Sequence, residues 1–153
     1  MEPPIVAGVA GGVGTTLVAQ ALRGADHGIY GCSTAVDVLV CRSTLYSVSA
    51  AQRALQTTPA PPILAIVDDV PHATWGTNTT NKIRLTEPYV YRYIRIPMVA
   101  EWRDNPHPHA VAGNVLVDDE RSLPKGIRSF AEALRELVDV VTEAATAHCP
   151  QSA

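Results

Sequence analysis

The residues best suited to chemistry form a glycine-rich turn near the N-terminus, where residues 10–16 read AGGVGTT. Glycines permit positive φ angles and close backbone approach, so successive amide groups can point at one anion. Apolar residues at helical spacing follow, and a helix N-terminus adds partial positive charge. The hydroxyl of Thr15 or Thr16 can cap this helix, and that of Thr16 can alternatively contact a phosphate or its magnesium ion. The pattern predicts a phosphate-binding loop with contacts from Gly11, Gly12, Val13, Gly14, Thr15 and Thr16.

This loop departs from the usual phosphate-binding sequence GxxxxGK[ST] at two positions. Thr15 stands where that pattern has lysine, and Val9 stands where it has its first glycine. The loop therefore keeps the shape of a phosphate site without its catalytic charge. Arg42, which follows a later apolar run, is the candidate to supply a cation in place of the lysine. In the alternative interpretation, the glycines only permit a tight strand-to-helix turn and bind no ligand.

Asp68 is a second candidate site residue, because it directly follows the apolar run 63–67. In nucleotide-hydrolysing P-loop proteins, a strand of this form ends in a carboxylate that holds magnesium. The same form arises whenever a buried strand ends in solvent, since an acid is a good loop residue. Thr16 and Asp68 are therefore candidate magnesium ligands only in the case that a magnesium nucleotide binds.

The histidines and cysteines do not indicate a metal centre. His107 and His109 have the spacing of a ligand pair, but no third ligand accompanies them, so we expect both in an exposed loop. The three cysteines are odd in number and show no CxxC spacing, which favours buried free thiols over a disulfide framework or a zinc site. They are Cys32, Cys41 and Cys149.

Strands and helices that alternate along the chain supply the scaffold for these residues. Apolar and β-branched runs predict strands over residues 5–9, 36–41, 63–67 and 89–96. Helical spacing predicts helices from residue 15, over 45–55 with Ser43 or Thr44 as cap, and over 126–145, whereas 23–28 read as a polar turn. This order predicts a three-layer α/β/α sandwich around a mainly parallel sheet, with ligands at the carboxyl ends of its strands. The last helix is predicted to bury one face, made of Ile127, Phe130, Leu134, Leu137, Val138 and Val141.

The segment 89–96 reads YVYRYIRI and combines aromatic residues with arginine. Strand alternation places Tyr89, Tyr91, Tyr93 and Arg95 on one face. Aromatic rings interleaved with arginine can stack nucleic-acid bases on an exposed sheet. We favour the alternative in which the tyrosines pack under a helix with their hydroxyls at the edge.

Composition favours a single domain with its own core. The chain has 153 residues, of which 46% are hydrophobic. We expect one degenerate P-loop-like domain over residues 1–148 and a frayed tail over 149–153. The formal net charge of −3 gives no global attraction to nucleic acid or to an anionic membrane. The sequence MEPP lacks the basic start of a signal peptide, and apolar runs are too short to insert in a membrane, which favours a cytoplasmic location.

The chain resembles the ParA/MinD-type P-loop ATPases, including the TadZ/CpaE-like branch associated with pilus assembly. The loop AGGVGTT is similar to the family sequence KGGVGKT or KGGVGATT, DVLVCRST resembles a later strand, and IRIPMVAEWRDNP resembles the strand and loop near the adenine side. The resemblance implies a P-loop NTPase-like fold, ATP or ADP with magnesium as ligand, and a homodimer.

Both family lysines are absent, at Ala10 and Thr15. Their loss implies a fall in hydrolysis on the order of 10³ to 10⁵, the effect of comparable charge-stabilising groups. We therefore expect a shortened, non-hydrolysing member that acts as a scaffold or as a localisation or interaction module. Its expected partner is a protein or a second copy of the chain.

Two alternatives stay open. Gly8, Gly11 and Gly14 form GxxGxxG, which resembles the loop of malate dehydrogenases, so an NAD(P)-binding Rossmann-type protein is one of them. Arg42 would then meet the 2′-phosphate of NADP, although the usual interval from the glycines to the ribose-reading residue is about 20 residues and this one is longer. The other is a weak magnesium-dependent ATPase that uses Thr16 and Asp68.

Overall fold

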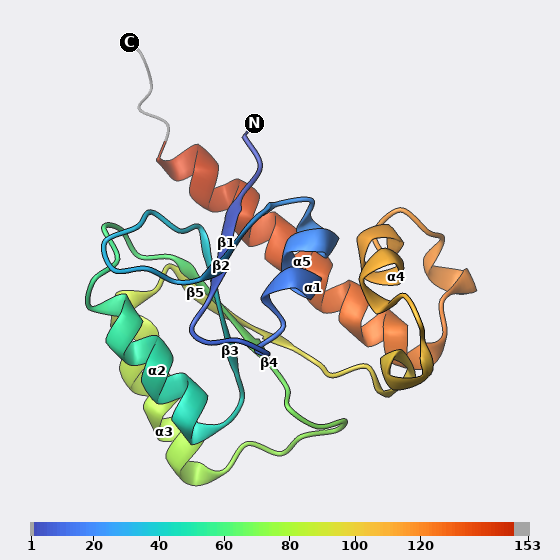
Figure 1. Cartoon of the computed structure of the whole chain (residues 1–153), viewed down its shortest axis with the longest axis horizontal. Coiled ribbons are helices and arrows are strands. Elements are labelled where there is room, and N and C mark those ends of the chain that lie inside the picture. The colour runs from blue at the N-terminus through green and yellow to red at the C-terminus, as the bar shows by residue number, and fades with distance from the viewer. Residues whose placement is uncertain (1, 149–153) are drawn as a thin grey trace.

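Five parallel strands form the central sheet of a computed structural model that describes residues 2–148 (Figure 1). The strand order across the sheet is β2-β1-β3-β4-β5, which places the first strand between the second and the third. The strands are β1 (Ile5–Gly8), β2 (Ala25–Ile29), β3 (Val38–Arg42), β4 (Ile63–Val67) and β5 (Arg92–Ile96). The predicted tail 149–153 lies outside the described residues.

Helices cover both faces of this sheet. They are α1 (Thr15–Leu22), α2 (Leu45–Leu55), α3 (Thr77–Thr86), α4 (Pro108–Asn114) and α5 (Lys125–Ala147), with short 3₁₀ turns at Glu87–Tyr89, Ala100–Asp104 and Glu120–Ser122. Helices α1 and α5 pack on one face, and α2 with α3 packs on the other, as Figure 1 shows. The three-layer α/β/α sandwich with a parallel sheet is thereby confirmed.

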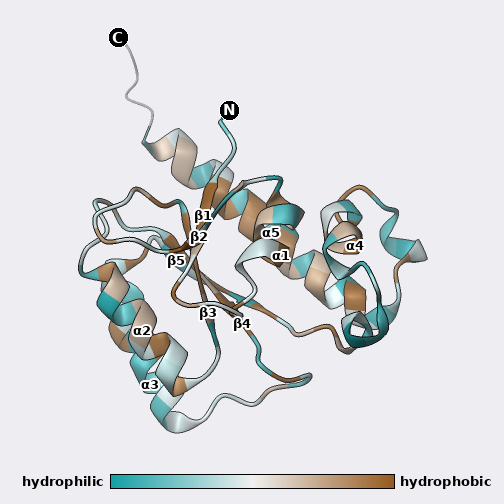
Figure 2. Ribbon diagram, in the orientation of Figure 1, coloured by the Kyte–Doolittle hydropathy of each residue, from teal (hydrophilic) through white to brown (hydrophobic). Residues whose placement is uncertain are grey.

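Alternating side chains of the inner strands pack into two separate hydrophobic cores, one on each face of the sheet. In β3, Val38 and Val40 face α1 and α5, whereas Leu39 and Cys41 face α2 and α3. Figure 2 shows apolar residues along the strands and mixed colours along the flanking helices. Burial on both faces explains why β4, and β3 up to its last residue Arg42, are continuous apolar runs.

The boundaries of the central elements match the sequence prediction most closely. Helix α2 spans the predicted residues 45–55, and Thr44 is its cap, since the Thr44 hydroxyl accepts a hydrogen bond from the Ser47 amide. Helix α5 exceeds its predicted range by one residue at its start and two at its end. On its predicted buried face, Val138 is 36% exposed and Val141 is only partly buried.

Three predictions about the outer elements were wrong. The predicted polar turn 23–28 contains β2, an edge strand that pairs only with β1, so its polar side chains can remain in solvent. Both histidines are exposed as predicted, but their segment is not a loop throughout, because Pro108 begins α4 and places His109 in its first turn. The strand predicted over 89–96 starts only at Arg92.

The late start of β5 changes which side chains share a face. The hydroxyl of Tyr91 donates a 3.0 Å hydrogen bond to Glu143 of α5, and Arg92 also approaches Glu143. Arg95 instead contacts the segment that precedes α3. The predicted single face of tyrosines and arginine is therefore split between the two sides of the sheet.

No helix within residues 2–148 combines the length and the apolar character needed to cross a bilayer. The longest helix, α5, carries charged residues along its length, among them Glu132, Arg135 and Glu143.

Burial of Cys41 predicts a measurable difference between two thiols. Desolvation raises the pKa of the Cys41 thiol from 9.0 to about 12, whereas Cys32 is exposed. Because the thiolate is the reactive form, we expect iodoacetamide at about pH 8 to label Cys32 but not Cys41 in a natively folded Cys149→Ser variant. Peptide mass mapping checks this, and equal labelling of both thiols would contradict it.

The raised pKa of the Cys41 thiol also means that ionisation favours the unfolded chain, so the free energy of unfolding should fall as pH rises from 9 toward 12.

Candidate functional site

The glycine-rich loop joins the end of β1 to the start of α1. Its backbone is left-handed at Gly12, with φ of 75°, and at Gly14, with φ of 99°. Side chains with a Cβ adopt this conformation at a cost, which explains why glycine stands at both positions. Left-handed residues alternating with ordinary ones turn successive amides toward one concave side, as in known anion-binding loops.

The first-turn amides of α1 are among the free donors at this loop. Within residues 2–148, the N–H groups of Gly14, Thr15, Thr16 and Leu17 have no hydrogen-bond acceptor. Gly14 is the cap residue, so the expectation that a threonine hydroxyl caps α1 was wrong. The unpaired amides leave this helix end able to accept an anion.

The hydroxyl of Thr16 is directed to β2 instead. It donates a 2.8 Å hydrogen bond to Asp26, whose other carboxylate oxygen accepts a 2.8 Å bond from the Gly28 amide. Sequence reasoning missed Asp26, because the residues around it read as a turn. Pairing of β2 with β1 brings its carboxylate beside the loop. A hydroxyl and a carboxylate together are oxygen ligands of the kind that magnesium prefers.

Arg42 lies against the loop at the end of β3. Its Nε and Nη2 donate to the Gly12 carbonyl at 3.2 and 2.9 Å, and its Nη1 donates to the Asp68 carbonyl at 3.2 Å. This position follows from the sheet order, since β3 is the direct neighbour of β1. The guanidinium thus fixes the loop to the end of β4 and places a permanent positive charge beside it.

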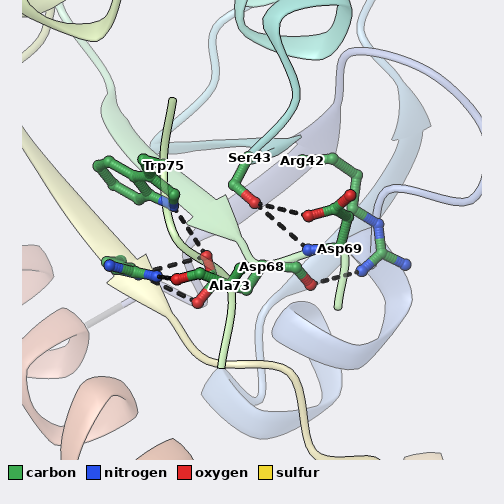
Figure 3. A network of polar contacts seen from close by, with 7 residues as sticks. Arg42, Ser43, Asp68, Asp69, Ala73 and Trp75 are labelled. Carbon is green, nitrogen blue, oxygen red and sulfur yellow. Dashed lines mark hydrogen bonds and ion pairs between the residues drawn. The ribbon is translucent and has the colours of Figure 1, made fainter. Parts of the chain in front are cut away.

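The carboxylate of Asp68 points away from the loop and is fully engaged (Figure 3). Arg95 Nε donates to both of its oxygens, at 3.2 and 3.0 Å, and Trp75 Nε1 donates to one at 2.9 Å. Arg95 also donates to the Ala73 carbonyl, and its guanidinium carbon lies 4.5 Å from the centre of the Trp75 ring. Asp68 is only 3% exposed. A magnesium ion at Asp68 would have to displace these contacts.

The neighbouring carboxylate, Asp69, is also paired. The Ser43 hydroxyl donates a 3.1 Å hydrogen bond to the Asp69 carboxylate and accepts a 3.3 Å hydrogen bond from the Asp69 amide. This pair joins the turn after β3 to the turn after β4 (Figure 3). It acts with Arg42 to hold the carboxyl end of the sheet in one arrangement.

Two adjoining cavities open beside the loop. The first, of about 400 Å³, is bounded by the loop, β2 and α4, and its lining includes Ala10, Gly11, Gly12, Gly14, Thr15, Thr16, Asp26, Arg42 and His109. The second, of about 210 Å³, is apolar and lies between the loop and the segment after β5, where Pro97, Met98, Val99 and Trp102 line it. Gly14, Leu17 and Arg42 border both cavities.

The structure brings most of the predicted site residues together. Gly11, Gly12, Gly14, Thr15, Thr16 and Arg42 line the first cavity. Two predicted residues lie apart from it. Val13 is buried among the residues packed between the sheet and α5, and the Asp68 carboxylate faces Arg95.

In comparisons with known proteins, no protein family, no curated protein sequence and no solved structure matches the chain.

Proposed function

We propose that the chain is a P-loop NTPase-like, ParA/MinD-like module that binds a mononucleotide without hydrolysing it. The observation that carries the proposal is the set of unpaired amides from Gly14 to Leu17, which opens on a cavity bordered by Arg42. The phosphates would lie against these amides. The adjoining apolar cavity would hold the base, in agreement with the resemblance of its segment, 94–106, to the adenine side of that family.

The strand order supports a mononucleotide ligand. The chain leaves β1 toward β2 on one side and β3 lies on the other, so the loop sits at the point where the strand order reverses. Flavodoxin-like proteins share the order 2-1-3-4-5 and bind a mononucleotide at this point, whereas classic dinucleotide-binding sheets have the order 3-2-1-4-5-6. The strand order also argues against the NADP alternative. In a dinucleotide-binding sheet, the residue that contacts the 2′-phosphate follows the second strand, whereas Arg42 ends β3, on the other side of β1.

The charges around the loop support binding without hydrolysis. Phosphoryl transfer depends on cations placed on the β- and γ-phosphates. Among the described residues no lysine lines either cavity, and the Asp68 carboxylate is paired with Arg95. Thr16 and Asp26 would hold a magnesium ion that accompanies the nucleotide and neutralises part of its charge. Arg42 would hold the loop in its binding conformation.

Exposed apolar side chains near the carboxyl ends of β3 and β4 support a role in protein interaction. Leu45 and Tyr46 begin α2, and Val70 follows the Asp69 turn that Ser43 contacts. All three are exposed, Tyr46 to 80%. A nucleotide bound beside them would link ligand state to a protein partner or to a second copy of the chain.

Thermal unfolding with candidate ligands tests this proposal. We expect ADP with magnesium to raise the melting temperature, because ligand at about 100 times its dissociation constant adds about 2.7 kcal/mol of stability. We expect no ATP turnover in the same buffer. A shift with NADP alone, or with FMN alone, would assign the site to another cofactor. Magnesium-dependent ATP turnover that an Asp68→Asn change abolishes would instead support the weak ATPase.

A further inference from the structure

Helix α4 places a histidine opposite the glycine-rich loop. Its first turn begins at Pro108, and it packs along α1. His109 in that turn lines the same cavity as Thr15, Thr16, Asp26 and Arg42, although it is 93 positions after Thr16 in the chain. The sequence prediction of a solvent-exposed loop histidine gave no reason to connect it with the loop.

His109 is the less engaged of the two basic side chains that line this cavity. Arg42 already donates three hydrogen bonds to the carbonyl oxygens of Gly12 and Asp68. No side-chain hydrogen bond or ion pair of His109 occurs within residues 2–148, and His109 is exposed, so its ring is available to a ligand. A protonated imidazole carries a positive charge and donates from both nitrogens, which suits a phosphate oxygen.

We propose that His109 contacts the bound phosphate and replaces the absent loop lysine in a pH-dependent way. The inference rests on the proposed function, since it concerns the ligand of the same loop. Other charged groups at the cavity are Asp26 from β2 and Arg42 from β3. Helix α1, on which α4 packs, has no ionisable side chain between Thr15 and Leu22.

The sign of the pH dependence follows from the charge of imidazole. Histidine is the side chain that ordinarily changes charge between about pH 5 and 8, with the cation on the acid side. Affinity for a dianion should therefore fall as pH rises through this window. Sulfate is the suitable first ligand, because its own charge is constant there, whereas the terminal phosphate of ADP gains charge as pH rises.

Calorimetric titrations at about pH 5.5 and about pH 8 test the inference on the wild-type protein and three variants. The variants are His109→Gln, His109→Lys and, as matched control, His107→Gln, which alters a histidine outside the cavity lining. We expect wild type and His107→Gln to bind sulfate and ADP with magnesium, with sulfate affinity about tenfold higher at the lower pH, the effect of one charge-assisted hydrogen bond. The His109→Gln variant should lose the difference in sulfate affinity between the two pH values. The His109→Lys variant should bind sulfate tightly at both.

The outcomes separate this inference from the proposed function. If wild type binds ADP and His109→Gln retains the full pH dependence for sulfate, the role of His109 is wrong and the nucleotide site stands. If wild type binds neither ligand at either pH, both proposals are wrong. NMR spectra of the wild-type protein give a second readout. A change in the chemical shifts of the His109 ring protons when sulfate is added supports direct contact, and unchanged shifts argue against it.

Discussion

Replacing Gly11 with aspartate is expected to lower the affinity for ADP roughly 30-fold while the fold is retained. Gly11 lines the first cavity, its φ is not in the left-handed region, and a Cβ built there meets no atom within 4 Å. The new side chain therefore fits without strain, but it places a carboxylate beside the predicted phosphate. Two unit charges about 4 Å apart repel by about 4 kcal/mol at an effective dielectric of about 20, and solvent reduces this to about 2 kcal/mol.

Gly11→Asn is the matched control for that experiment. It adds a side chain of similar reach without the charge, so its affinity for ADP should stay within about threefold of wild type. Isothermal titration gives the affinities, and circular dichroism melting checks that both variants fold. Equal affinities of the two variants would show that the phosphate does not lie beside Gly11.

Replacing Arg95 with alanine is expected to lower the free energy of unfolding by about 2–3 kcal/mol. Removing one partner of a buried pair costs about 3–5 kcal/mol, because the other charge stays buried without compensation. The Asp68 side chain is 4% exposed, but that of Arg95 is 43% exposed, so solvent screening lowers the expected cost. The loss of the Arg95 contacts with Trp75 and Ala73 adds to it.

The same strand supplies a control. Arg92→Ala removes a 3.8 Å contact with Glu143 in which both side chains are more than half exposed, so it should cost less than about 1 kcal/mol. Urea denaturation measures both changes. Because the cost for Arg95 comes from a stranded carboxylate, adding Asp68→Asn to Arg95→Ala should recover part of the loss. A cost for Arg95→Ala no larger than that for Arg92→Ala would mean that the network does not stabilise the fold.

The central elements could be predicted because their signals are local. A strand buried on both faces, such as Ile63–Val67, must be apolar throughout, and Thr44 caps the helix that begins at the next residue. The glycine-rich loop could also be predicted, since the left-handed conformations of Gly12 and Gly14 favour that residue type.

Edge elements and long-range polar pairs carry no such signal. Strand β2 pairs on one side only and is mostly exposed, so the polar residues Asp26 to Gly28 can form a strand without an apolar pattern. The partner of the Asp68 carboxylate is 27 positions away, and the sheet register that places Arg95 beside Ile66 of β4 decides that pairing. For the same reason the sequence suggested Asp68 as a magnesium ligand and gave no indication of Asp26.

The most direct test of nucleotide binding at this loop is an amide chemical-shift titration of the ¹⁵N-labelled protein with ADP and magnesium. Saturable shifts should appear first in the amides of Gly11, Gly12, Gly14, Thr15 and Thr16, which border the first cavity. Smaller shifts should follow in the segment 97–103, which borders the apolar cavity. Loop amides that stay unchanged at saturating ADP, or shifts confined to the opposite, amino-terminal ends of the strands around Pro59 and Ile63, would contradict the proposed function.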